Sequence, residues 1–368
     1  MHLLEPRANP SVIMRWASPA LAVLLTLFVG SLLFIALKKD PLEAFRVFFI
    51  DPLNSAYGWS ELLLKASPLI LIAQGLAIGF KARIYNIGAE GQLIMGAIFG
   101  GGVALLFEGT GSSFALPAMV LAGALGGALW GALPALLKTR FNAEETLTTL
   151  MLAYVASFLL SWLVSGPWKD PGGMNFPQTV MFAATSQFSM LADGLRINTS
   201  IFITLAAVAA FYLFTKKSLL AYAITVGGEA PAAARYAGFS SKRTVWFALT
   251  LSGLTAGLAG IAEVAGPIGQ LNLNISPGYG YAAIIVAWIG RLHPVGIVGA
   301  GLLMALLYLG GEQAQLALQL PAAITGLFQG MLLFFLLGCD AFIDYRLRRR
   351  KRRAVVATKP AVPVQEAA

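Results

Sequence analysis

The residue run Tyr85-Asn86-Ile87-Gly88-Ala89-Glu90-Gly91-Gln92 places one carboxylate, two amides and two glycines between long apolar stretches. Such groups can bind a polar solute, carry a proton or accept the N–H groups of an interrupted helix. A charge at membrane depth is a functional-site hypothesis by default. Two roles stay open for Glu90, namely holding broken backbone or contacting a transported solute. The candidate pathway residues are Tyr85, Asn86, Gly88, Glu90, Gly91 and Gln92.

The composition indicates an integral membrane protein. Of the 368 residues, 58% are apolar and 12% are charged, and the mean hydropathy is +0.75. A soluble globular protein of this length is much more polar. The single cysteine, Cys339, excludes an internal disulfide, and two histidines leave no metal cluster. The sequence therefore predicts neither metal nor catalytic residues. The net charge of +9 does not predict a nucleic-acid partner, because in an apolar chain the positions of the basic residues matter more than their sum.

Apolar stretches predict an all-α polytopic fold with about ten crossings, since a helix needs about 20 apolar residues to cross a bilayer. The stretches lie near 17–37, 62–80, 86–107, 114–137, 146–165, 197–214, 244–265, 276–290, 295–312 and 318–338. An even number of crossings puts both termini on one side.

The basic residues predict that this side is the cytoplasm. Most of the 26 Lys and Arg residues fall in segments on the side of the termini, as the positive-inside rule requires. Residues 1–16 are then a cytoplasmic N-terminus and 17–340 the transmembrane domain. The tail, 341–368, is expected to be basic, disordered and cytoplasmic, with Arg346–Arg353 as an anchor on anionic lipid. The stretch at 17–37 is longer than the apolar core of a signal peptide, so it is expected to be retained.

Two of the crossings are irregular. Leu93–Phe107 is short for a crossing, so the motif near 85–92 is expected to be a broken or re-entrant segment within the membrane. Tyr281–Gly290 is shorter still and would have to recruit the helix-poor stretch Ser276–Gly280. Irregular backbone is tolerated at membrane depth only inside protein or along a water-filled cavity. The similar positions of the two segments predict inverted repeats.

The loop over 215–243 is predicted to lie in the cytoplasm and to carry a short helix over Gly228–Gly238. Pro231 suits the first turn of a helix and Gly238 suits its C-terminal cap. A weakly apolar helix outside the membrane is a natural docking element, although one lying on lipid headgroups is the alternative. The candidate docking residues are Gly228, Glu229, Ala233, Arg235, Tyr236 and Gly238.

These segments resemble one family of transport proteins. Asn86–Gln92 resembles the N-I-G-A-E-G-Q signature of the nucleoside and simple-sugar branch of ABC importer permeases, the inner-membrane components of binding-protein-dependent transport systems. Further similar blocks are Asn142–Tyr154, Gly166–Thr179, Ala233–Gly260 and Gly278–Gly296. The resemblance covers roughly 60–340. The sequence departs from the family at Ala143, Glu144, Ala153 and His293, which weakens any substrate role for the block at 142–154.

The resemblance implies a permease subunit in a bacterial inner membrane that forms a pathway for nucleosides or related simple sugars. It implies three partners besides the lipid bilayer, namely cytoplasmic ABC ATPase subunits, a second permease chain, identical or homologous, and a substrate-binding protein. The chain has no G-x-x-x-x-G-K-[ST] motif, so it is expected to bind no cofactor and to be no enzyme, with ATP hydrolysed by a partner. One alternative is a stand-alone secondary transporter that uses Glu90 for ion coupling. An intramembrane enzyme is disfavoured, because no paired carboxylates or nucleophile–base pair stand at helical spacing.

Overall fold

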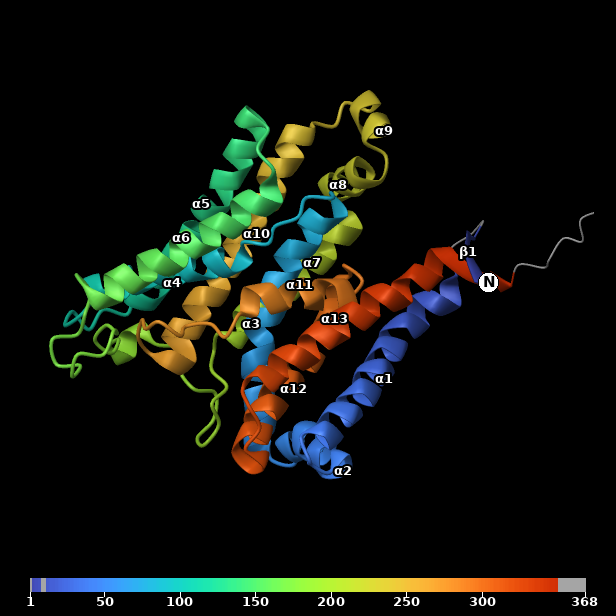
Figure 1. Ribbon diagram of the computed structural model, residues 1–368. Coiled ribbons are helices and arrows are strands. Elements are labelled where there is room, and N and C mark those ends of the chain that lie inside the picture. Colours follow the sequence, from blue (N-terminus) through green and yellow to red (C-terminus); the bar gives the residue numbers. More distant parts are fainter. Residues whose placement is uncertain (1, 8–10, 350–368) are drawn as a thin grey trace, which may run out of the picture.

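The protein folds into a bundle of long helices in the computed structural model, which describes residues 2–7 and 11–349 (Figure 1). The long helices are α1 (Val12–Ala36), α3 (Ala56–Lys81), α4 (Ala89–Leu106), α5 (Ala115–Phe141), α6 (Glu145–Ser165), α10 (Ser241–Glu263), α12 (Pro294–Leu318) and α13 (Ala323–Asp344). The shorter helices are α2 (Pro41–Phe45), α7 (Ile201–Lys217), α8 (Leu219–Glu229), α9 (Pro231–Tyr236) and α11 (Tyr279–Ile289). Single turns of π-helix at Arg46–Ile50 and Val264–Ile268 and of 3₁₀-helix at Asp51–Leu53 and Ala184–Ser186 complete the helical segments.

Each of the ten predicted crossings contains a helix, and the all-α membrane fold is confirmed. Among the described residues, eight helices are long and apolar enough to cross a bilayer. The other two crossings differ from a simple span. Helix α7 has 17 residues and meets α8 at an angle of 72°, while α11 has only 11 residues. The sequence predicted that this crossing would include Ser276–Gly280. Helix α11 instead starts at Tyr279, and Ser276–Gly278 stays outside it, so the helix is short.

Small residues let α4, α5 and α10 approach to backbone contact at the centre of the bundle. A methyl group at Gly253 of α10 would lie 2.2 Å from the carbonyl oxygen of Gly127 in α5. One at Gly96 of α4 would lie 2.3 Å from the Cα of Gly257. Because lipid supplies no hydrophobic drive between helices, such close packing is a main source of their association. These glycines are packing residues.

The helix contacts repeat within the chain. Helix α3 packs against α10, α11 and α12, and α10 packs against α3, α4 and α5. If α3, α4, α5 and α6 are matched in turn with α10, α11, α12 and α13, the contacts of α3 become those of α10. The contact between α4 and α6 then corresponds to the contact between α11 and α13. The two units start from opposite faces, because five crossings separate them. The contact pattern thus supports the predicted inverted repeats.

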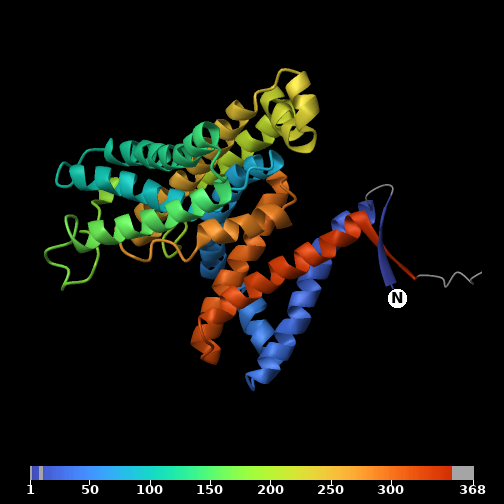
Figure 2. The same cartoon turned by 45° about the horizontal axis from the view of Figure 1, so that its top comes forward.

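Helices α1 and α13 form an arm at one side of the bundle (Figure 2). At its tip, strand β1 (His2–Pro6) pairs antiparallel with strand β2 (Tyr345–Arg349), and Ser11 donates its backbone N–H to the carbonyl of Ile343. The two described ends of the chain therefore lie on one side, as the even number of crossings predicted. The tail boundary at 341 needs correction, since α13 continues to Asp344 and 345–349 form a strand. The predicted disorder of 350–368 lies outside the described residues.

Candidate functional site

The signature motif begins as a non-helical segment that enters the bundle. Helix α3 ends at Lys81, and Arg83 adopts a φ of 57°, which turns the chain away from the helix. Residues 84–87 belong to no helix or strand, Gly88 is in a turn with φ −87° and ψ 16°, and α4 starts at Ala89. The side chains of Ile84 and Asn86 are buried, whereas Tyr85 is 41% exposed. A broken segment near 85–92 is therefore present, as predicted.

The Asn86 side chain ties this segment to two helices. Its amide nitrogen donates to Gln92 Oε1 in α4 and to Ser252 Oγ in α10, both at 2.8 Å. Its carbonyl oxygen accepts from the N–H of Gly88 at 3.0 Å. Asn86 is 2% exposed, so each bond replaces one that water would otherwise supply. Asn86 and Gln92 hold the loop rather than line an open space.

The two glycines of the motif allow α6 to pack directly on the start of α4. A methyl group at Gly88 would lie 2.2 Å from the carbonyl oxygen of Thr149. One at Gly91 would lie 2.5 Å from the Cα of Ala153. Neither backbone atom can move aside cheaply, so any larger residue would force the two helices apart.

Glu90 joins the first turns of two helices. Its carboxylate accepts the backbone N–H of Gly280 at 2.7 Å and a hydrogen bond from the Ser276 side chain. Ser276 Oγ in turn accepts the N–H groups of Gly278 and Tyr279. The first turn of a helix leaves N–H groups without intrahelical partners, and a negative charge there is favourable. Glu90 therefore caps the N-terminus of α11 inside the bundle.

The other end of α11 is also fixed. Arg291, which follows the helix, donates to both carboxylate oxygens of Asp340 in α13, at 2.6 and 2.7 Å, and to Ser18 in α1. A two-pronged guanidinium–carboxylate contact restricts orientation as well as distance. Helix α11 is consequently held between Glu90 at one end and the α1–α13 arm at the other.

The predicted docking helix is present but shorter than expected. Gly228 and Glu229 belong to the last turn of α8, and Ala230 separates them from α9. Pro231 occupies the first turn of α9, and Gly238 takes a φ of 81° after its end, as the sequence predicted. The sequence suggested one helix because the alanines conceal the break that Pro231 imposes on the preceding residue.

Most of α9 faces solvent. Tyr236 is 97% exposed, and Ala233 and Arg235 are exposed as well, whereas Ala234 is buried. An aromatic ring so fully exposed beside an arginine has the composition of an interface anchor, because Tyr and Arg are enriched at binding hot spots. Helix α9 therefore exposes a tyrosine and an arginine side by side, and its docking role stays a prediction.

A continuous set of contacts links this surface to the motif. A methyl group at Gly228 would lie 2.0 Å from the carbonyl oxygen of Lys81, so α8 touches the end of α3 directly. The segment after Lys81 leads through Asn86 to Glu90 and α11. A cavity of about 170 Å³ between α9 and this segment is lined by Arg83, Lys138, Ala234 and Phe239, among others. Displacement of α8 and α9 would thus reach the buried helix ends.

Comparison with known proteins assigns the family. A family model described as the permease component of the branched-chain amino acid transport system matches residues 58–337. The chain belongs to this permease family. The glucose ABC transporter permease protein TsgB13 of Haloferax volcanii is 36% identical, over 94% of this chain and 93% of its own. The nucleoside ABC transporter permease protein NupB of Lactococcus lactis is 28% identical, over 79% of this chain and 82% of its own. The guanosine ABC transporter permease protein NupP of Bacillus subtilis is 25% identical, over 90% of this chain and 96% of its own.

In this permease, the signature residues and the docking residues form two separate groups joined by the end of α3. Within the signature, only Tyr85 is exposed, and its ring contacts that of Phe80 at 5.9 Å between centroids, whereas the other five candidate residues are buried. Gln74 donates to the carbonyl oxygen of Pro294, and Gln270 donates to the side-chain oxygen of Gln178. Sequence reasoning did not find Ser252 and Ser276 as partners, because single serines carry no spacing signal.

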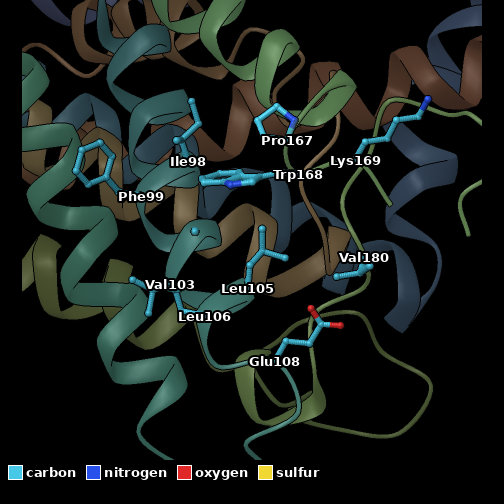
Figure 3. Close-up of a pocket in the computed structure, with 11 residues that line it drawn as sticks. Ile98, Phe99, Val103, Leu105, Leu106, Glu108, Pro167, Trp168, Lys169 and Val180 are labelled. Carbon is cyan, nitrogen blue, oxygen red and sulfur yellow. The ribbon is translucent and has the colours of Figure 1, made fainter. Parts of the chain in front are cut away.

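A second cavity lies near the opposite end of α4. It has a volume of about 610 Å³. It is lined mainly by apolar residues of α4 and by Pro167, Trp168 and Val180 of the loop that follows α6 (Figure 3). Trp168 packs on α4, since a methyl group at Gly102 would lie 3.0 Å from its ring. Glu108 and Lys169 supply the charges at its edge. The loop at 166–179, noted in the sequence as a family-like block, therefore forms one wall of a surface cavity.

Proposed function

We propose that this permease pairs with a second permease chain, identical or related, to form the pathway of an ATP-driven importer in a bacterial cytoplasmic membrane. The substrates are nucleosides or related simple sugars. Cytoplasmic ABC ATPase subunits bind the α8–α9 surface and hydrolyse the ATP, so this chain needs no cofactor of its own. A substrate-binding protein delivers the solute on the opposite face. The glucose, nucleoside and guanosine named for three relatives support the substrate class.

The observation that carries this proposal is the series of contacts that joins the exposed helix α9, through α8 and the end of α3, to the buried starts of α4 and α11. Tyr236 is 97% exposed, while Glu90 and Gly280 are fixed inside the bundle. Packed interfaces tend to switch between discrete arrangements rather than deform continuously. Closure of the ATPase subunits against α9 would therefore shift α8, the end of α3 and the Glu90–α11 contact together.

The direct test is reconstitution of the complete transporter in proteoliposomes. The permease, its ATPase subunits and a binding protein are assembled, and uptake of labelled guanosine and glucose is followed with and without ATP. We expect ATP-dependent accumulation of at least one of them. The control uses the permease alone under a proton or sodium gradient. Uphill transport by the chain alone, or accumulation of neither solute by the full assembly, would contradict the proposal.

Substitution of Glu90 separates a capping role from ion coupling. In Glu90→Gln, the amide oxygen still accepts the Gly280 N–H, so uptake is expected to stay within about threefold of the wild type. In Glu90→Ala, a buried N–H loses its partner, which costs about 1–3 kcal/mol of stability. Uptake assays and thermal unfolding of the purified complex measure both effects. Complete loss of uptake in Glu90→Gln with unchanged stability would favour the secondary-transporter alternative.

A further inference from the structure

Three exposed tyrosines lie close in the chain to residues that meet at the start of α4. Tyr281 directly follows Gly280, the residue bonded to Glu90, and Tyr154 follows Ala153, against which Gly91 packs. Tyr85 opens the signature motif. The exposed fractions are 41% for Tyr85, 53% for Tyr154 and 38% for Tyr281. Tyr154 and Tyr281 therefore stand next to residues that pack on the first turn of α4, and Tyr281 is within electrostatic range of Tyr154, while the Tyr85 ring contacts Phe80 of α3. We call these three residues the tyrosine face.

Two of the tyrosines lie near the middle of the membrane. Helix α6 has 21 residues and is about 31 Å long, and Tyr154 lies about 14 Å from its first residue. Arg291 follows the end of α11 that the charge pattern assigns to the cytoplasm. Tyr281, near the other end of this helix, lies about 15 Å from Arg291 along the helix axis. A bilayer core is about 30 Å thick. Two helices thus place an exposed tyrosine at about the same central depth.

The hydroxyl groups at this depth have no partner in the described part of the chain. None of the three takes part in a side-chain hydrogen bond there, whereas Asn86 and Gln92 beside them are bonded. A hydroxyl group facing lipid without a partner costs a few kcal/mol. Tyrosines that contact lipid gather at the membrane interfaces rather than at the centre. The two central tyrosines, Tyr154 and Tyr281, are therefore better suited to a water-filled space than to lipid.

We propose that the tyrosine face is the substrate-contacting wall of the pathway, turned toward the second permease chain. This rests on the proposed function and assigns the recognition chemistry. The ligand is a neutral ring compound with an apolar face and a hydroxylated edge, whether nucleoside or sugar. Aromatic rings stack on such faces, and phenolic hydroxyls both donate and accept hydrogen bonds. Because no charge is involved, the contact is weak enough to release the solute.

Thiol labelling tests whether water reaches the tyrosine face. The chain has one cysteine, Cys339, which is buried, so Cys339→Ala gives a background without thiols. Tyr154→Cys and Tyr281→Cys are reconstituted in the full transporter and treated with a charged, membrane-impermeant methanethiosulfonate. We expect labelling at least tenfold faster than in Leu129→Cys. Leu129 is a matched control, since it is 59% exposed and lies near the centre of α5. Equally slow labelling at all three positions would overturn the proposal.

Transport assays test contact with the solute. Tyr154→Ala and Tyr281→Ala are expected to lower the maximal uptake rate at least tenfold, with basal ATP hydrolysis, subunit assembly and thermal stability retained. The Phe replacements keep the ring and are expected to lose about threefold. Phe158→Ala, one turn along α6 and 74% exposed, is the control and should transport normally.

The two solutes and the assembly state give the remaining outcomes. Saturating guanosine or glucose is expected to slow the labelling of Tyr154→Cys, and the solute that does so identifies the class. Loss of the second chain from Tyr154→Ala would assign the tyrosines to subunit contact and overturn the proposal, as would unchanged uptake of both solutes. If the wild-type assembly transports neither solute, the proposed function itself fails. That outcome is distinct from failure of the tyrosine proposal, which requires a wild-type assembly that transports.

Discussion

Gly280→Ala is expected to abolish stable assembly of the permease. The added methyl group would lie 2.2 Å from the backbone nitrogen of Glu90 and 2.5 Å from its Cα, so the starts of α4 and α11 would have to separate. Overpacking against backbone costs about 1–3 kcal/mol or more, and the Glu90–Gly280 hydrogen bond would be lost as well. Thermal unfolding of the purified protein, together with uptake by the full transporter, measures the effect.

Gly299→Ala is the matched control for this substitution. Gly299 lies in α12 with no heavy atom within 4 Å of the added methyl group, and alanine favours a helix over glycine. Its stability should equal or slightly exceed that of the wild type. If Gly280→Ala behaved like Gly299→Ala, the close meeting of α4 and α11 described above would be wrong.

Replacing Arg235 and Tyr236 together by alanine is expected to uncouple transport from ATP hydrolysis. A Tyr or Arg anchor at the centre of an interface contributes about 2 kcal/mol or more, so losing both should weaken ATPase binding at least a hundredfold. Insertion and thermal stability should be unaffected, because Tyr236 is 97% exposed and Arg235, among the described residues, bonds only within its own helix, to Pro231. Co-purification of the ATPase subunits and ATP-dependent uptake are the measurements.

Tyr222→Ala controls for the loss of an exposed ring on the same cytoplasmic loop. Tyr222 is 63% exposed and lies in the first turn of α8, whereas the candidate docking residues Gly228 and Glu229 lie in its last turn. It should retain both ATPase binding and uptake. Full transport by the Arg235/Tyr236 double variant would mean that the ATPase subunits bind elsewhere.

The sequence by itself determined the features that depend on neighbouring residues. Apolar runs located a helix at each of the ten predicted crossings, eight of which are long and apolar enough to span a bilayer, because a helix in lipid must satisfy its backbone within one continuous segment. Pro231 and Gly238 marked the start and end of α9 for an equally local reason, since each acts on the backbone of its own turn. The order of the family-like blocks then identified the permease family.

Only the tertiary structure decided what the signature motif does. Glu90 caps a helix 190 positions away, and Asn86 bonds to Ser252, 166 positions away, pairings that no local period encodes. The bend between α7 and α8, the β1–β2 pairing and the exposure of Tyr154 and Tyr281 likewise depend on which segments meet in space. A hydrogen-bonding side chain can serve a backbone or a solute equally well, and only its neighbours in the folded chain select between them.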